Sequence, residues 1–276
     1  MPYNLLKGKK GIIFGALNNQ SIAWKVAERA FEEGATMVLT NAPAAKRLGD
    51  VETLARTCNA EVFYADATNL DDLKNLIQFT MQKLNGKIDF LLHSIGMSPN
   101  VRKGIPYENI NYENYLKTLD VSALSLHKIL QTCRTLDAFN EGASVVTLSY
   151  IASQRTFYGY NDMADAKAML ESIVRNFGYI CGREKKVRIN TVSQSPTVTT
   201  AAGPIKGFSS LFDFSHRMAP LGNATAEECA DYIITLFSDL TRKVTMQNLY
   251  HDGGFSSMGM SYEAMEQYSK TQGTEG

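Results

Sequence analysis

The chain has 276 residues, and its 28 lysines and arginines balance 28 aspartates and glutamates, so its formal net charge is zero. Hydrophobic residues make up 44% of the chain, which is enough for a large buried core, and the length is within reach of a single α/β domain. The sequence has no basic stripe and no acidic block, so we do not expect it to bind nucleic acid.

The cysteines and the apolar runs indicate the kind of compartment. The four cysteines lie far apart without paired spacing, which favours neither a zinc site nor a disulfide framework. We therefore expect no metal site, and reduced thiols typical of a cytoplasmic protein.

The apolar run at residues 11–14 is too short for a signal sequence, and no run approaches the ~20 residues of a membrane span, so no membrane association is expected.

Short apolar runs alternate with helical periodicity along the chain. The predicted strands are residues 11–14, 36–40, 61–64, 88–93, 144–149, 188–192 and 248–251. The predicted helices are residues 21–33, 71–84, 112–137, 162–181 and 226–240. This alternation predicts an α/β fold of the Rossmann type, a three-layer α/β/α single domain with a mostly parallel sheet. The domain is expected to span residues 1–268, followed by a disordered tail at residues 269–276.

The first turn after a strand has features of a phosphate site. Gly15 follows the apolar run and permits a sharp turn, and Ser21 stands where a helix N-cap is expected. Free N–H groups and the positive end of a helix both favour an anion. Only one glycine of the G-x-G-x-x-G pattern is present, so an ordinary capped turn stays open as the alternative.

The ends of the next two strands leave the recognition of a nucleotide open. No acid follows residues 36–40 to bind a ribose; Lys46 and Arg47 stand nearby, where they would either hold a 2′-phosphate or solvate a helix start. Asp66 follows residues 61–64, where it would accept from an adenine amine, cap the next helix, or do both.

Tyr160 and Lys167 are seven residues apart. On a helix this spacing is about two turns, so both side chains would lie on one face about 10 Å apart, with Met163 and Ala164 between them. Surface helices often carry such pairs. Three neighbouring strand ends nevertheless lead into residues 93–96, 148–150 and 193–199, and parallel strands would bring these segments to one edge of the sheet.

These residues resemble the short-chain dehydrogenase/reductase superfamily and, more closely, its NADH-dependent enoyl-[acyl-carrier-protein] reductases of fatty acid synthesis. The similarity extends over residues 11–255. The matching segments are Gly15 with residues 21–23, Asp66, residues 93–96, residues 148–150, Tyr160 with Lys167, Pro196 with Thr199, and residues 252–255. Ordinary members of the superfamily have Tyr-x3-Lys, whereas position 164 here is alanine and the spacing is Tyr-x6-Lys.

The resemblance implies reduction of the trans-2 double bond of enoyl-acyl-carrier-protein thioesters during fatty acid elongation. Tyr160 would donate a hydrogen bond to the thioester oxygen, Lys167 would hold the nicotinamide ribose, and Tyr150 would line the acyl pocket or merely close a strand end. The expected catalytic residues are Tyr150, Tyr160 and Lys167. The expected cofactor-binding residues are Gly15, Ser21, Ile22, Asp66, Ala67, Ser94, Ile95, Gly96, Leu148, Lys167, Pro196, Thr197 and Thr199. The expected substrate-binding residues are Met97, Tyr150, Tyr160, Met163 and Phe208.

The resemblance also implies the cofactor and the partners. NADH is expected, with NADPH as the alternative because Ala42 stands where many NADH-specific members have glutamine. The partners would be an acyl carrier protein bearing the enoyl thioester, and small-molecule inhibitors in the acyl pocket. A substrate-binding flap at residues 199–220 would close over the acyl chain. The subunits would form a homotetramer through residues 112–137, residues 162–181 and the last strand.

Two other functions stay open. A carbonyl reductase would share the fold, but its lysine would stand at position 164, where this chain has alanine. A non-catalytic sensor or scaffold would keep the dinucleotide site, yet it would not need Tyr160 and Lys167 together.

Overall fold

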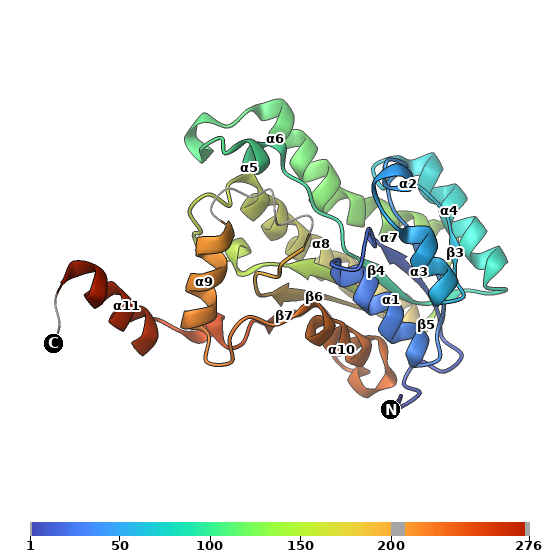
Figure 1. The fold of residues 1–276 in the computed structure, drawn as a ribbon. Coiled ribbons are helices and arrows are strands. Elements are labelled where there is room, and N and C mark those ends of the chain that lie inside the picture. Colours follow the sequence, from blue (N-terminus) through green and yellow to red (C-terminus); the bar gives the residue numbers. More distant parts are fainter. Residues whose placement is uncertain (1, 200–207, 274–276) are drawn as a thin grey trace.

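The predicted apolar runs pair into one parallel sheet. In the computed structural model, which describes residues 2–199 and 208–273, seven strands lie in the order β3-β2-β1-β4-β5-β6-β7 (Figure 1). The strands are β1 (Lys10–Phe14), β2 (Thr36–Thr40), β3 (Glu61–Val62), β4 (Ile88–His93), β5 (Phe139–Ser149), β6 (Arg188–Gln194) and β7 (Asn248–His251). All neighbouring pairs are parallel.

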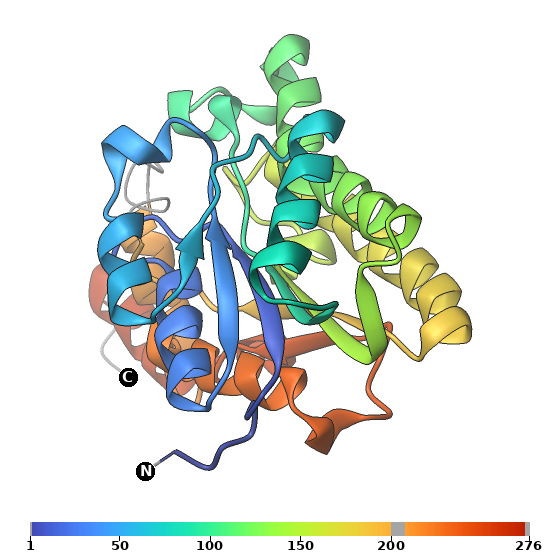
Figure 2. The same ribbon diagram turned by 90° about the vertical axis from the view of Figure 1, so that its right-hand side faces the viewer.

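Helices cover both faces of this sheet, as Figure 2 shows. One face packs on α1 (Ile22–Glu32), α3 (Val51–Thr57) and α10 (Ala226–Phe237), and α2 (Ala45–Leu48) precedes α3. The other face packs on α4 (Leu70–Lys83), α7 (Ser125–Thr135) and α8 (Asp162–Lys185). The predicted three-layer α/β/α fold is therefore confirmed.

The strand sequences explain why both faces are covered. Successive side chains of β1 alternate between the layers, so that Ile12 and Phe14 pack toward α4, α7 and α8 while Ile13 packs toward α1 and α10. All three side chains are nearly inaccessible to solvent. Burial of each contributes about 1.5–3 kcal/mol, so an apolar run without polar alternation is stable only between two helical layers.

One predicted helix is divided. Residues 112–137 form α6 (Tyr112–Leu119), a wider π-helical turn (Asp120–Leu124) and α7, rather than one continuous helix. The π turn places Ser122 against the chain after β4, where its hydroxyl accepts from Met97 N at 2.9 Å. Hydrophobic spacing does not reveal a one-residue widening of this kind, which often occurs at functional sites. Together with α5 (Pro99–Lys103), α6 rises above the carboxyl edge of the sheet (Figure 1).

The C-terminal part contains helices that were not predicted. These are α9 (Phe208–Met218), which forms the described part of the expected flap, and α11 (Tyr262–Gln272). Ser261 Oγ donates to Arg217 O at 2.8 Å, and beyond this contact α11 projects from the body (Figure 1). Helix continues to Gln272, four residues into the segment expected to be a disordered tail. Flap residues 200–207 and tail residues 274–276 lie outside the described residues. In the described ranges, no helix has the length and apolarity needed to cross a bilayer.

Candidate functional site

The connections from β1 and β4 leave the sheet in opposite directions, because β2 lies beyond β1 and β5 lies beyond β4. A parallel sheet binds ligands at such a switch point, outside the carboxyl ends of its strands. Gly15 has φ +98° there, and a Cβ at this position would lie 2.0 Å from Ser94 O. The two loops therefore meet backbone to backbone, which only glycine permits.

The loop between β1 and α1 suits an anion. Ser21 occupies the N-cap position, as predicted, but its hydroxyl accepts from Leu17 N and Asn18 N, each at 3.3 Å. The Ser21 hydroxyl thus stabilises the loop and makes no capping hydrogen bond to the start of α1. A helix start without a side-chain cap beside a close glycine turn fits the phosphates of a dinucleotide.

The nucleotide-recognition candidates lie toward β2 and β3. Asp66 Oδ1 accepts from Thr68 N and Thr68 Oγ1 at 2.9 and 2.7 Å, so its carboxylate closes its own turn. The N-cap of α4 is instead Asn69, and the alternative that Asp66 caps this helix is therefore wrong. Ala67 follows in the same turn, and Lys46 and Arg47 are exposed on α2.

Lys167 joins three segments at this edge. Its side chain is buried, and Nζ donates to Leu148 O at 2.7 Å. A Cβ on Gly96 would lie 3.9 Å from both Lys167 Nζ and Met163 Cε, so the loop after β4 passes directly over the lysine. Burial lowers the pKa of Lys167 to about 8, although the negative charge of Glu171 raises it in part.

Tyr160 and Tyr150 lie side by side, with ring centroids 5.0 Å apart. Burial raises the pKa of both phenols, so both are neutral at physiological pH. The hydroxyl of Tyr150 is buried and has no hydrogen-bond partner among the described residues. The two-turn explanation of the Tyr160 to Lys167 spacing is wrong, because α8 begins at Asp162 and Tyr160 lies in the turn before it. Asn161, with φ +46°, separates the tyrosine from the helix.

Aromatic side chains complete this part of the site. The ring centroid of Phe157 lies 5.2 Å from that of Tyr150 and 5.9 Å from that of Phe255. Sequence reasoning missed Phe157, although its place shortly before Tyr160 was a signal. Tyr158, the residue after Phe157, is fully exposed.

A buried carboxylate was also missed. Glu171 accepts from Ser149 Oγ at 2.7 Å, from Ser153 Oγ, and from Gln154 Nε2 at 3.1 Å. It lies one helical turn after Lys167 on the same face of α8, and this spacing was the signal for it.

His93 is a structural residue of the site. Its ring is buried, with Nδ1 2.8 Å from Thr147 Oγ1 and Nε2 2.9 Å from Ser125 Oγ. Burial, together with the charge of Lys167, lowers its pKa to about 3, so the ring is neutral. It anchors the loop that carries Ser94 and Gly96.

The remaining candidate residues come from the loop after β4, the start of α1, the segment after β6 and the start of α9. Ile95 packs against the core on the α4, α7 and α8 side, and Ile22 opens α1. Thr197 Oγ1 donates to Ser195 O at 3.1 Å, between Pro196 and Thr199 in the segment after β6. Phe208 begins α9, and its ring centroid lies 6.1 Å from that of Phe212.

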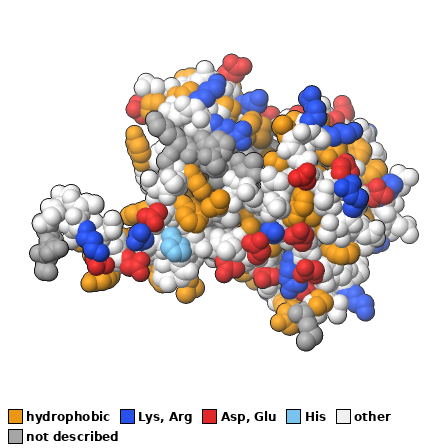
Figure 3. All heavy atoms as spheres, viewed as in Figure 1, with side chains coloured by type: hydrophobic (Ala, Val, Ile, Leu, Met, Phe, Trp, Pro, Cys, Tyr) orange, Lys and Arg blue, Asp and Glu red, His pale blue; other side chains and the backbone are white. Residues whose placement is uncertain are grey.

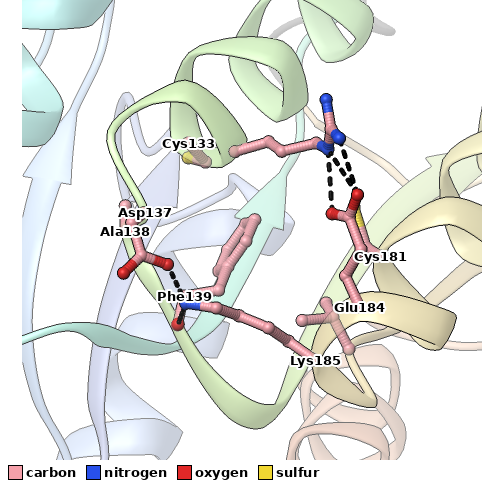
Figure 4. A pocket seen from close by; sticks show the side chains of 9 residues that line it. Cys133, Asp137, Ala138, Phe139, Cys181, Glu184 and Lys185 are labelled. Carbon is pink, nitrogen blue, oxygen red and sulfur yellow. Dashed lines mark hydrogen bonds and ion pairs between the residues drawn. The ribbon is translucent and has the colours of Figure 1, made fainter.

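A small cavity lies at the opposite edge of the sheet and is not part of this site. Its volume is about 60 Å³, and it opens where α7 and α8 end beside the start of β5 (Figure 4). Arg134 and Glu184 pair across it at 2.6 Å, and Lys185 pairs with Asp137. Among the described residues, no group of three or more His, Cys, Asp or Glu side chains is placed to hold a metal ion.

Comparisons with known proteins identify the family. A family model for Enoyl-(Acyl carrier protein) reductase matches residues 15–256. This chain belongs to the enoyl-(acyl carrier protein) reductase family. The enoyl-[acyl-carrier-protein] reductase [NADH] FabI of Rickettsia typhi is 35% identical over 267 residues, which cover 95% of this chain and 99% of that protein.

Solved structures of other enoyl-acyl carrier protein reductases have the same fold. The FabI–NADH complex from Alistipes finegoldii has a TM-score of 0.95 and 66% identity, covering 96% of this chain and 94% of that one. The enzyme from Aquifex aeolicus has a TM-score of 0.86 and 31% identity, covering 93% and 99%. The resemblance inferred from the sequence is therefore confirmed across almost the whole chain.

Proposed function

We propose that this protein reduces the trans-2 double bond of enoyl thioesters carried by an acyl carrier protein, with NADH as the reductant. The observation that carries the proposal is that Tyr160 packs against Tyr150 just beyond β5, while Lys167 donates to Leu148 O near the end of the same strand, in a chain of the enoyl-acyl carrier protein reductase family.

Tyr160 would stabilise the charge that develops on the substrate. NADH, when bound, would supply a hydride to the β-carbon. Negative charge would gather on the thioester oxygen until a proton from solvent reaches the α-carbon and completes the reduction. A preorganised neutral donor stabilises such an oxygen, and loss of one donor typically costs about 10²–10³ in rate. Burial raises the pKa of Tyr160, which keeps its proton in place as a hydrogen-bond donor. Tyr150 and the Phe157 ring would shield the reacting carbons from water.

Lys167 would bind the nicotinamide ribose. Its ammonium donates to Leu148 O and lies beneath the loop that carries Gly96. An ammonium has three N–H donors, so two more would serve a ligand wherever the described residues do not use them. The ribose hydroxyls are suitable acceptors for them. Because its pKa of about 8 lies above neutrality, the lysine is mostly charged at physiological pH.

NADH is proposed over NADPH. The names of the relatives from Rickettsia typhi and Bacillus subtilis specify NADH. Lys46 and Arg47 are exposed on α2, which supports the interpretation that they solvate this short helix. Titration with each reduced nucleotide tests this choice, and tighter binding of NADPH than of NADH would contradict it.

The carrier protein and the homotetramer are proposals of the same kind. Lys, Arg, Asp and Glu side chains are interspersed over the face in Figure 3, without a large area of one sign. We therefore propose that a carrier docking on this face would use scattered basic residues. Exposed apolar side chains on the long helices support assembly of subunits: Tyr112, Leu116, Leu124, Tyr179 and Ile180. Sedimentation measures the assembly directly.

One assay tests the activity against its alternatives. The purified protein is mixed with NADH and, in parallel, with a trans-2-enoyl thioester or a 3-ketoacyl thioester. We expect oxidation of NADH with the enoyl thioester alone. Turnover of the keto substrate would support a carbonyl reductase, and binding of NADH without turnover of either would support a sensor.

A further inference from the structure

A buried carboxylate lies two residues after Tyr160. Asp162 is the first residue of α8 and is 0% exposed. Its Oδ1 accepts from Ser98 Oγ at 2.6 Å, and its Oδ2 lies 2.9 Å from Asn100 Nδ2 and 2.8 Å from Thr118 Oγ1. Within the described residues it takes part in no ion pair. The anion is held by neutral donors and by the positive end of α8.

The three donors come from one part of the fold. Ser98 is the N-cap of α5, Asn100 lies within α5, and Thr118 lies near the end of α6. All three side chains are buried. We call residues 97–119 the cover, because this segment lies above the carboxyl edge of the sheet and begins with Met97 of the expected acyl pocket. The carboxylate thus joins both helices of the cover to the start of α8.

The turn between Tyr160 and α8 is held from the same side. Asn161 has φ +46° and ψ −134°, a strained conformation for a residue other than glycine, which persists only where its surroundings hold it. Its side-chain amide donates to Ile105 O in the cover. Asp162 adds its three hydrogen bonds directly afterwards, so both residues that follow Tyr160 are fixed to the cover.

We propose that Asp162 is a positioning residue for the reaction, which holds the Tyr160 phenol against the acyl pocket by locking the turn 160–162 to the cover. This inference rests on the proposed function. A carboxylate is suited to the task because it accepts hydrogen bonds at both oxygens and can hold three donors at once. An apolar residue would fill the space but would fix neither the direction of the turn nor its distance from the cover.

If Asp162 only stabilised the cover, it would make the same hydrogen bonds. The experiment must therefore distinguish stabilisation of the cover from positioning of the Tyr160 phenol. If Asp162 acts through the phenol, its loss costs rate only while Tyr160 is present. If it merely stabilises the cover, its loss costs the same factor with or without the phenol. A double-mutant cycle on kcat distinguishes these cases.

The first variant is Asp162→Asn, which keeps the shape. The amide nitrogen that then faces Ser98 cannot accept the hydrogen bond that the Ser98 hydroxyl donates to Asp162, so one of the three bonds is lost. The amide oxygen still accepts from Asn100 and Thr118. We expect kcat to fall about 10- to 100-fold, as for a small displacement of a catalytic group. In the Tyr160→Phe background we expect less than a ~2-fold further change. The affinity for NADH, measured by titration, should stay unchanged.

The matched control is Asp165→Asn. Asp165 lies one turn further along α8 and also contacts the cover, since its Oδ2 accepts from Tyr107 and Tyr115 hydroxyls at 3.1 and 3.2 Å. It does not border the turn 160–162, so kcat should be unchanged. If Asp162→Asn does not fold, Thr118→Val removes one of the three donors and enters the same cycle.

The outcomes separate this inference from the proposed function. A wild-type protein that does not reduce enoyl thioesters would overturn both. An active wild type with equal loss of kcat in both backgrounds, or with no loss, would overturn the positioning role alone. Loss confined to the background that retains Tyr160 would support it.

Discussion

The rings of Tyr150 and Tyr160 lie with their centroids 5.0 Å apart and their planes at 51°, although one residue follows β5 and the other precedes α8. This pairing brings a strand end and a helix start to one place. It leaves the Tyr150 hydroxyl buried and without a partner among residues 2–199 and 208–273. Buried hydroxyls without a hydrogen bond are rare in folded proteins, and they occur at sites where a bound ligand supplies the missing partner.

Tyr150→Phe should therefore stabilise the ligand-free protein. A buried hydroxyl without a hydrogen bond costs about 1–3 kcal/mol, and phenylalanine keeps the ring packing while removing that cost. Thermal unfolding without ligands measures the effect. If the hydroxyl also contacts the acyl thioester, the KM for this substrate should rise at the same time. A lower melting temperature would show that the hydroxyl is satisfied in the free protein.

Gly15→Ala should disrupt the turn after β1. The added methyl group would meet Ser94 O at 2.0 Å, in a backbone conformation with φ +98°. We expect NADH binding to weaken at least ~10-fold and the fold to lose on the order of 1–3 kcal/mol. Gly8→Ala is the control, because Gly8 has φ +74° but a Cβ there would lie more than 4 Å from every non-neighbouring atom of the described residues. Equal effects of both substitutions on NADH binding would contradict the close approach of the two loops.

Lys167 should make stability depend on pH in the alkaline range. Its pKa of about 8 in the folded state lies below the ordinary value of 10.5, so the unfolded chain binds more protons between these values. The free energy of unfolding therefore increases as the pH rises from about 8 to 10.5. From neutral pH to pH 10.5, the unfolding free energy of wild type minus that of Lys167→Met should rise by on the order of 3 kcal/mol. A difference independent of pH would mean that the ammonium is not desolvated.

Apolar runs were enough to locate most strands, because a strand between two helical layers has few polar residues. The bounds of β2, β4 and β7 agree with the prediction. By contrast, β5 begins at Phe139, five residues early, since polar residues and Gly142 with φ +76° interrupt its first part.

The details of the site depend on tertiary contacts, which leave no periodic pattern in the sequence. The periodicity of hydrophobic residues does not predict that Asn161 turns the chain before α8. Nor does it predict that the side chains of Ser98, Asn100 and Thr118 all bind one carboxylate. Tyr160 and Lys167 were found through their spacing, but the helix geometry first used to explain that spacing was wrong. In the structure, Asn161 turns the chain between Tyr160 and α8, and Lys167 is buried beneath Gly96.

The most direct test of the central claim is the steady-state rate of enoyl thioester reduction by Tyr160→Phe, with NADH affinity measured on the same samples. If the phenol donates a hydrogen bond to the thioester oxygen, kcat should fall about 10²–10³-fold while the affinity for NADH is retained. A variant that turns over as fast as wild type would contradict this account.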